Sequence, residues 1–203
     1  MSEKRNEKKG DGKYRMLQMM AAHTLSDEER EEHDYYATQP IAAEWLMRLE
    51  PLDKNIWECA CGEGHLSKPL MSAGHNVRST DLINRGFGEG GIDFLAQTEP
   101  FDGDIVTNPP YKYASEFIEH ALSLVTEGHK VCMFLKIQFL EGKARRKMFE
   151  RTHPKTIWVS STRIRTAMNG DFEKYCRTGG AVAYGWYVWE KGYTGETTLK
   201  WFN

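Results

Sequence analysis

The sequence has few cysteines, no long apolar run and little net charge, and each shortage excludes a class of protein. Four cysteines in 203 residues, Cys59, Cys61, Cys132 and Cys176, are too few for a small disulfide-stapled secreted domain. No apolar stretch approaches the roughly 20 residues of a transmembrane helix, and the polar segment 1–15 lacks the apolar core of a signal peptide. We therefore expect a protein of the reducing cytoplasm, with no membrane association.

Metal-ligand clusters are also scarce. Cys59-x-Cys61 with the nearby His65 is a single group, and its spacing matches no common zinc pattern. Both thiols are better explained as small side chains in a tight loop. We expect no metal site.

The net charge of −2 conceals an uneven distribution. Between Lys136 and Thr178 there are 11 basic and 4 acidic residues, so this segment carries +7 and the remainder of the chain −9. A basic face on an otherwise acidic protein suits a polyanionic partner. A solvated helix face would explain the same charges, because residues 144–151 have a helical pattern.

Strands and helices alternate along most of the chain. A charged arm and a short helix from Ser26 to about His33 make up residues 1–34, and Pro40 opens a second helix that runs to Leu49. After Pro51 we expect strands at 55–58, 77–80, 92–95, 105–107, 130–135, 156–160 and, as the last strand, 183–190, with helices at 66–72, 115–125 and 144–151. This order predicts one α/β domain over residues 35–203, with a mainly parallel, doubly wound sheet and helices on both faces.

Residues 108–111, Asn-Pro-Pro-Tyr, directly follow the strand expected at 105–107. Two consecutive prolines fix two φ angles near about −65° and remove two backbone donors, so neither helix nor sheet can continue. We expect a rigid turn, called the Asn108 corner below, that holds the Asn108 amide, nearby carbonyls and the Tyr111 ring in one array. Acceptors beside an aromatic ring suit a planar ligand with an NH2 group, although an ordinary strand-to-helix turn would explain the same residues.

The strand expected at 55–58 leads into Cys59-Ala60-Cys61-Gly62-Glu63-Gly64, called the glycine loop below, and then into a helix. A strand, a Gly-x-Gly loop and a helix form a nucleotide-binding arrangement, but the third glycine of the dinucleotide fingerprint and the Gly-Lys-Ser/Thr of a phosphate loop are missing. Glu58 suits a cationic ligand, and Asp81 suits the two hydroxyls of a ribose. A helix cap or a solvated strand end would explain either acid alone.

Taken in order, the glycine loop, Asp81 and the Asn108 corner resemble the motifs of the S-adenosylmethionine-dependent methyltransferases that modify the exocyclic amine of adenine in DNA. The resemblance extends from Tyr35 to Tyr193 and implies a Rossmann-like class I methyltransferase fold with S-adenosylmethionine as cofactor. It implies a catalytic role for Asn108, Pro109, Pro110 and Tyr111. It implies cofactor contacts from Tyr36, Thr38, Glu58, Cys59, Gly62, Gly64, Asp81, Leu82, Asp93, Phe94 and Asn108. In the N-terminal motif Tyr36-x-Thr38-x-Pro40, Gln39 replaces a proline of the common form.

Three further stretches are similar to the small phage-type members of this family: Phe139-Leu140-Glu141-Gly142, Asp81-x-x-x-Arg85-Gly86-Phe87-Gly88 and Trp186-x-Val188-Trp189-x-Lys191-Gly192. The resemblance implies DNA as the partner and a bacterial or phage-infected cell as the setting. Large members of this family carry a separate target-recognition domain; in this sequence we expect residues 137–182 to serve in its place as the candidate DNA-contacting region. The candidate DNA-binding residues are Lys112, Lys143, Arg145, Arg163, Arg165, Asn169 and Lys174.

The implied reaction transfers a methyl group to the 6-amino group of adenine, with the base flipped out of the duplex and stacked on Tyr111. RNA adenine or guanine, or a glutamine amide in a release factor, would present a similar planar NH2 group. A partner subunit that keeps the fold without catalysis is a further alternative. The sequence indicates neither the recognition site nor the oligomeric state, nor whether a paired endonuclease exists.

Overall fold

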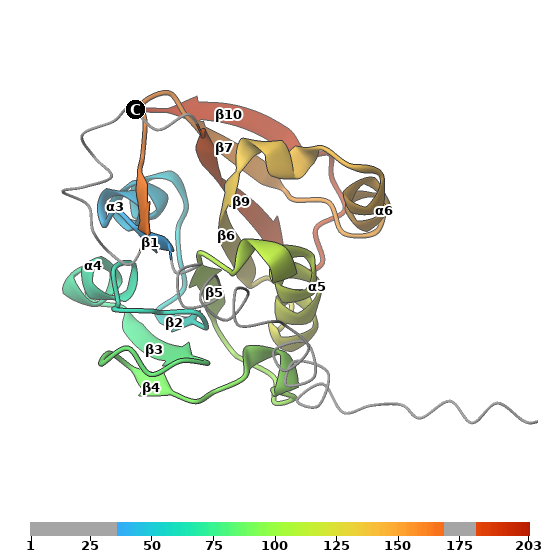
Figure 1. The fold of residues 1–203 in the computed structure, drawn as a ribbon. Coiled ribbons are helices and arrows are strands. Elements are labelled where there is room, and N and C mark those ends of the chain that lie inside the picture. Colours follow the sequence, from blue (N-terminus) through green and yellow to red (C-terminus); the bar gives the residue numbers. More distant parts are fainter. Residues whose placement is uncertain (1–35, 169–181) are drawn as a thin grey trace, which may run out of the picture.

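The computed structural model describes residues 36–168 and 182–203. Its centre is an eight-stranded sheet with the strand order β10-β7-β9-β6-β5-β2-β3-β4 (Figure 1). These strands are β2 (Asn55–Glu58), β3 (Asn76–Asp81), β4 (Glu89–Gly90), β5 (Asp104–Thr107), β6 (Lys130–Lys136), β7 (Thr156–Ser160), β9 (Tyr184–Glu190) and β10 (Thr198–Phe202). Within this sheet all neighbours pair in parallel except at β9, which is antiparallel to both β6 and β7.

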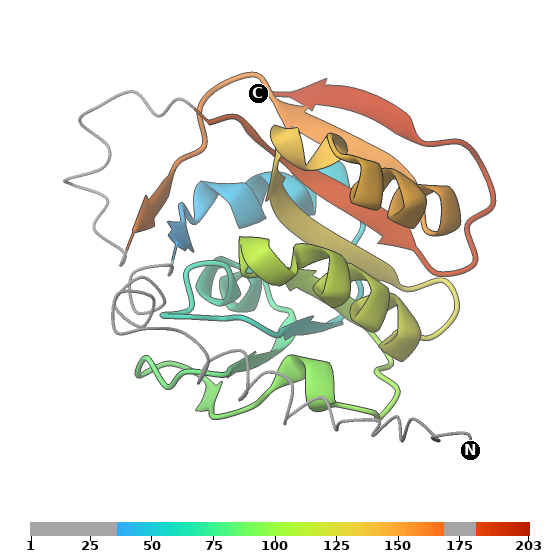
Figure 2. The same ribbon diagram turned by 45° about the vertical axis from the view of Figure 1, so that its right-hand side comes forward.

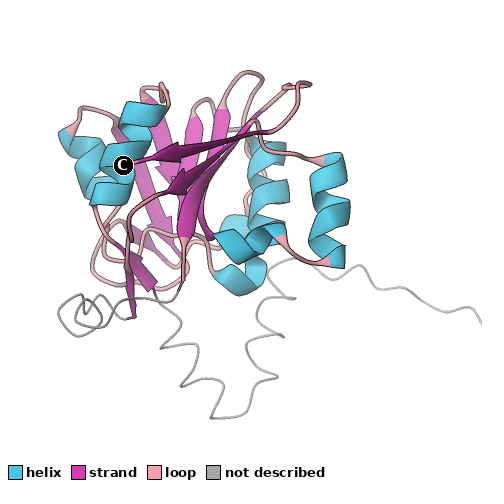
Figure 3. Cartoon of the chain, turned by 90° about the horizontal axis from the view of Figure 1, so that it is seen from above, coloured by secondary structure: helices cyan, strands magenta, loops and turns pink. Residues whose placement is uncertain are grey.

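Helices cover both faces of the sheet (Figure 3). The helices α3 (Ile41–Leu49) and α4 (Ser67–Ser72) pack on one face, and α5 (Ala114–Leu124) and α6 (Lys143–Arg151) on the other. Successive strand residues point to opposite faces, so Ile105 belongs to the core under α5 while its neighbour Val106 belongs to the core under α3. The predicted doubly wound, mainly parallel sheet is confirmed.

Two predicted strands were wrong in position or order. The strand expected at 92–95 is absent there: β4 pairs with β3 at Glu89–Gly90, and Phe94–Ala96 forms the single-turn helix η1. The Asp93 carboxylate accepts a hydrogen bond from the Leu95 backbone N–H at 3.0 Å, which favours the turn over an extended strand. Residues 183–190 are not the last strand, because β10 follows. The strand β10 was missed because only one of its residues, Phe202, is buried.

A separate two-stranded sheet joins β1 (Tyr36–Thr38) to β8 (Thr166–Met168) in antiparallel pairing. In Figure 2 this pair lies at the end of the main sheet where α5 begins. The carboxyl ends of β2, β3, β5 and β6 meet at that same edge. The fold therefore brings the glycine loop, Asp81 and the Asn108 corner together, as expected for parallel strands.

Some predictions fall outside the described residues. The arm and short helix of residues 1–34, together with Asn169, Lys174 and Cys176, are in this group. No helix within residues 36–168 and 182–203 is long and apolar enough to cross a membrane.

Candidate active site

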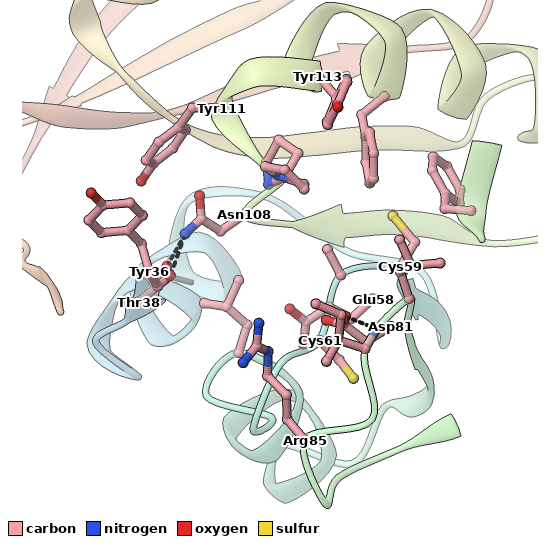
Figure 4. Close-up of a pocket in the computed structure, with 18 of the residues that line it drawn as sticks. Tyr36, Thr38, Glu58, Cys59, Cys61, Asp81, Arg85, Asn108, Tyr111 and Tyr113 are labelled. Carbon is pink, nitrogen blue, oxygen red and sulfur yellow. Dashed lines mark hydrogen bonds between the residues drawn. The ribbon is translucent and has the colours of Figure 1, made fainter. Parts of the chain in front are cut away.

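A pocket opens at the carboxyl edge of the sheet, between β1, the glycine loop, the end of β3 and the Asn108 corner (Figure 4). Its wall includes all four residues of the Asn108 corner. It also includes most of the predicted cofactor residues, namely Tyr36, Thr38, Glu58, Cys59, Asp81, Leu82, Asp93 and Phe94. Gly62 and Gly64, also predicted to contact the cofactor, are not among the described residues that line the pocket. Segments far apart in the chain thus form one concave site.

The Asn108 side chain is held by β1. Its Nδ2 donates to the Tyr36 backbone oxygen at 3.0 Å and to the Thr38 Oγ1 at 2.8 Å (Figure 4). A carbonyl oxygen can only accept, so the Tyr36 bond determines which end of the amide carries the nitrogen. The Asn108 Oδ1 is buried and makes no hydrogen bond to any residue that the structure describes. The corner therefore presents an unpaired acceptor.

The Tyr111 ring lies beside this acceptor. Its centroid is 5.7 Å from that of Tyr36 and 6.2 Å from that of Tyr184, and the Lys136 Nζ lies 4.4 Å from the ring centroid. Burial raises the pKa of the Tyr111 phenol well above its ordinary value, so the group stays neutral. The ring is thus part of an aromatic cluster with a cation over one face.

The two glycines determine the backbone conformation of the glycine loop. Gly62 and Gly64 have φ angles of 54° and 79°, which side chains other than that of glycine rarely allow. The Gly62 N–H donates to the Asp81 Oδ2 at 2.8 Å, and a Cβ on Gly64 would overlap the Phe87 ring. Here the glycines permit the backbone conformation and the packing of Phe87.

Glu58 and Asp81 differ in environment, although both line the pocket. Glu58 is buried and accepts a hydrogen bond from the Ser67 Oγ at 2.5 Å. Loss of hydration raises the pKa of Glu58 to about 8, and the nearby Asp81 charge adds to the rise. Asp81 accepts from Gly62 N–H and from Ile83 N–H at 2.8 and 2.9 Å. A carboxylate has about four acceptor positions, so Asp81 keeps capacity for a ligand.

The structure distributes the predicted DNA-binding residues over several elements. Lys143 and Arg145 lie in the first turn of α6, which follows β6 and so begins near the carboxyl edge. Arg163 is exposed between β7 and β8, whereas the Arg165 backbone bonds to Gln39. Lys112 lines the pocket as an exposed side chain. The basic segment is therefore not one continuous helix face.

Sequence reasoning missed several residues of the pocket wall. Arg85 and His65 bring a basic side chain and an imidazole to it, and Tyr113 and Phe117 extend its aromatic part. The stretch Asp81-x-x-x-Arg85-Gly86-Phe87-Gly88 was recognisable as a motif, but nothing local in it indicates that Arg85 points into the pocket. Three cysteines, Cys59, Cys61 and Cys132, are buried free thiols, and no cluster of metal-binding side chains occurs in the described parts of the chain.

No protein-family model matches the sequence, and no curated protein matches it either. Solved structures do match the fold. A protein from Listeria monocytogenes described as a class I S-adenosylmethionine-dependent methyltransferase superposes with a TM-score of 0.56 at 14% identity, covering 80% of this chain and 63% of that one. The present chain therefore spans less than two thirds of that protein.

Two further structures share the fold. An S-adenosylmethionine-dependent O-methyltransferase from Thermotoga maritima matches with a TM-score of 0.51 at 11% identity, over 77% of this chain and 67% of that one. The type IIG restriction endonuclease BpuSI matches with a TM-score of 0.51 at 16% identity, over 77% of this chain and 25% of that one. Together with the strand order, these matches show a Rossmann-like class I methyltransferase fold.

Proposed function

We propose that this protein transfers a methyl group from S-adenosylmethionine to the exocyclic 6-amino group of adenine in DNA. The observation that carries the proposal is the Asn108 side chain, which belongs to the pocket wall: its nitrogen is held by β1, and its oxygen is a buried acceptor without a partner among the described residues. Such an acceptor matches a planar NH2 donor. The adjoining acids and apolar wall match an adenosine-containing cofactor.

The residues present fit S-adenosylmethionine. Asp81 retains acceptor positions for ribose hydroxyls, and Leu82, Ile92 and Phe94 offer an apolar wall for the adenine ring. Glu58 lies in the same pocket and would face the cationic part of the ligand. A nearby positive charge favours the ionised carboxylate. When bound, the cofactor supplies a methyl group activated by its positively charged sulfur.

The Asn108 corner would activate the amine by electrostatics. The Asn108 Oδ1 and the Pro109 carbonyl would accept its two hydrogens and favour the tetrahedral geometry in which the nitrogen lone pair is available. An asparagine amide does not accept a proton, so the proton of the product leaves to solvent. Alignment of the amine with the methyl group supplies much of the remaining acceleration.

DNA is the proposed partner because exposed basic residues flank the pocket. Lys112 lies on its rim, and Lys143 starts α6 at the same edge of the sheet. Lysine and arginine side chains at such positions neutralise phosphates and orient a nucleic acid without reading its sequence. A flipped adenine would then enter the pocket beside Tyr36 and Tyr111.

The test is incubation with S-adenosylmethionine labelled in the methyl group and separate pools of duplex DNA, RNA and a release factor. Digestion of the products should place the label in N6-methyldeoxyadenosine from DNA. Label only in RNA nucleosides or only in protein would reject DNA as substrate. Failure to bind S-adenosylmethionine at millimolar concentration would reject the methyltransferase function altogether.

Substitution of Asn108 tests the corner itself. Asn108→Ala should reduce transfer by at least about 100-fold, the scale found for loss of one stabilising donor or acceptor in an active site, while cofactor affinity changes by less than about threefold. Asn76→Ala is a matched control, because Asn76 is exposed at the opposite end of β3. Equal loss of cofactor binding and transfer in Asn108→Ala would mean that the corner is only structural.

A further inference from the structure

Lys136, the last residue of β6, is a basic residue that the proposed reaction does not use. Its side chain is half-buried, and its Nζ lies 4.4 Å from the centroid of the Tyr111 ring and 5.8 Å from that of the Tyr36 ring. Both tyrosines belong to the pocket wall. Partial removal of an ammonium from water is costly unless another charge compensates it, so the position of Lys136 needs a reason.

The backbone fixes Lys136 at the carboxyl edge of the sheet. β6 pairs with β9, and in this register Lys136 lies opposite Tyr184. The Tyr187 hydroxyl donates to the Lys136 carbonyl oxygen at 3.1 Å, and the Ile137 N–H donates to the Ala183 carbonyl oxygen at 2.9 Å. The end of β6 is therefore tied to β9, and only the flexible side chain of Lys136 can move its ammonium.

No acid compensates this ammonium in the described parts of the chain. Its contacts there are the two tyrosine rings, and its Nζ has no hydrogen bond or ion pair within residues 36–168 and 182–203. An aromatic ring attracts a cation but does not neutralise its charge. By contrast, the Lys155 Nζ, at the opposite edge of the sheet, lies 2.7 Å from the Glu190 carboxylate. Lys136 therefore brings an uncompensated positive charge to the two rings.

The pocket has an acidic part and an aromatic part. Glu58 and Asp81 line the part next to the glycine loop, whereas Tyr36 and Tyr111 lie on the other side of Asn108 (Figure 4). Lys136 adjoins the aromatic part, which the proposed function assigns to the flipped adenine. The sugar of a flipped nucleotide carries a phosphate on each side, and insertion of the base leaves these phosphates at the opening of the pocket.

We infer that Lys136 binds a phosphate next to the flipped nucleotide, an inference that rests on the function proposed above. The phosphate supplies the negative charge that the described residues do not. The adenine base is neutral and would leave the ammonium uncompensated, which favours a phosphate over a base edge as its partner. Lys136 is a positioning residue in this scheme: it stabilises the extruded nucleotide without reading the sequence.

The test combines a substitution of Lys136 with removal of the phosphate charge. The substrate is a duplex oligonucleotide around an adenine that the labelling experiment finds methylated, made with ordinary phosphates or with uncharged methylphosphonates on both sides of that adenine. Lys136→Met keeps the apolar contact with the rings and removes the charge. On the ordinary duplex it should raise the KM for DNA on the order of 10-fold, the lower end of the range for a hydrogen bond to a charged group, with little change in kcat or in the KM for the cofactor. On the methylphosphonate duplex it should have no further effect.

The salt dependence of DNA binding gives a second readout. Loss of one phosphate contact lowers the slope of log affinity against log salt concentration by about 1. Lys136→Met should show this change, and Lys136→Arg, which keeps the charge, should not. Lys54→Met is the matched control, because Lys54 is exposed just before β2, at the opposite edge of the sheet. It should leave the KM and the slope unchanged.

An equal rise in KM on both duplexes would overturn the inference and assign Lys136 to the packing of Tyr111. An unchanged KM in Lys136→Met would overturn it as well. Lys136→Gln removes the same charge and takes the place of Lys136→Met if that variant does not fold. If the unaltered protein methylates no DNA, the proposed function fails and this inference fails with it; if it methylates the ordinary duplex and the phosphate charge makes no difference to the variants, only the role of Lys136 is excluded.

Discussion

The two polar ends of the Asn108 side chain have different surroundings. The nitrogen has two acceptors on β1, whereas the buried oxygen has no partner among the described residues. A buried acceptor without a hydrogen bond costs roughly 1–3 kcal/mol. This free energy is recovered when a donor enters, so the amide is preorganised for a ligand with an N–H group. The cost explains why such an oxygen is rare in a purely structural turn.

Thr38 is the residue of β1 whose side chain holds the amide. Thr38→Val removes the hydroxyl and leaves Asn108 Nδ2 with the Tyr36 oxygen alone. We expect a loss of about 1 kcal/mol in the free energy of unfolding and a lower kcat with little change in the KM for the cofactor. Steady-state kinetics and denaturant unfolding measure both.

Thr38→Ser is the matched control, since it keeps the hydroxyl in nearly the same volume. It should restore most of the kcat that Thr38→Val loses. If Thr38→Ser and Thr38→Val lose the same activity, Thr38 contributes by packing and not by orienting Asn108.

At the scale of secondary-structure elements, the shortest elements position the residues of the site. β1 and β8 have three residues each, yet β1 supplies both acceptors for Asn108 and β8 joins it by pairing. The glycine loop is the second such element. Its conformation depends on positive φ angles, and its contact with Phe87 joins it to the loop that carries Arg85.

Gly64→Ala tests how far that contact stabilises the protein. The substitution imposes a strained φ of 79° and places a Cβ against the Phe87 ring. We expect a loss of about 2–4 kcal/mol in the free energy of unfolding, because a clash adds to a backbone cost of about 1 kcal/mol. Weaker binding of S-adenosylmethionine should accompany it.

Gly128→Ala provides the comparison, because Gly128 has a similar φ of 84° but nothing within 4 Å of the added Cβ. The difference between the two variants in urea unfolding isolates the steric part. Equal losses would show that Phe87 moves aside at no cost and does not couple the two loops.

At the scale of the whole molecule, the stability of the domain should depend on the protonation of Glu58. The pKa of Glu58 is about 8 in the folded protein and 4.5 as the ordinary value, so folding takes up a proton between these pH values. The contribution to stability is therefore full below pH 4.5 and is lost as the pH rises to about 8. One proton corresponds to a slope of about 1.4 kcal/mol per pH unit.

Glu58→Gln should remove this slope. Thermal or urea unfolding between pH 5 and pH 8 should show the unaltered protein losing stability relative to Glu58→Gln as the pH rises. Glu116→Gln on α5, an exposed position, should keep the slope of the unaltered protein. Parallel curves for the unaltered protein and Glu58→Gln would show that Glu58 is hydrated and ionised in the folded state.

Much of the architecture could be predicted from local pattern. The apolar run of β6 and the helical spacing of α5 indicate their elements directly. The two prolines after β5 require a corner whatever surrounds them. By contrast, β4, η1 and β10 were misplaced or missed, because a two-residue strand and an exposed edge strand leave almost no periodic signal.

The sequence by itself determined most of the strands and helices of the central sheet, the Asn108 corner and the placing of Glu58 and Asp81 at strand ends. These features depend on neighbouring residues, whose backbone preferences and apolar spacing act locally. Only the tertiary structure decided which end of the Asn108 amide bonds to β1 and that Arg85 lines the pocket. Both depend on contacts between segments distant in the chain, namely β1 with the Asn108 corner and Phe87 with Gly64, and no local pattern encodes such contacts.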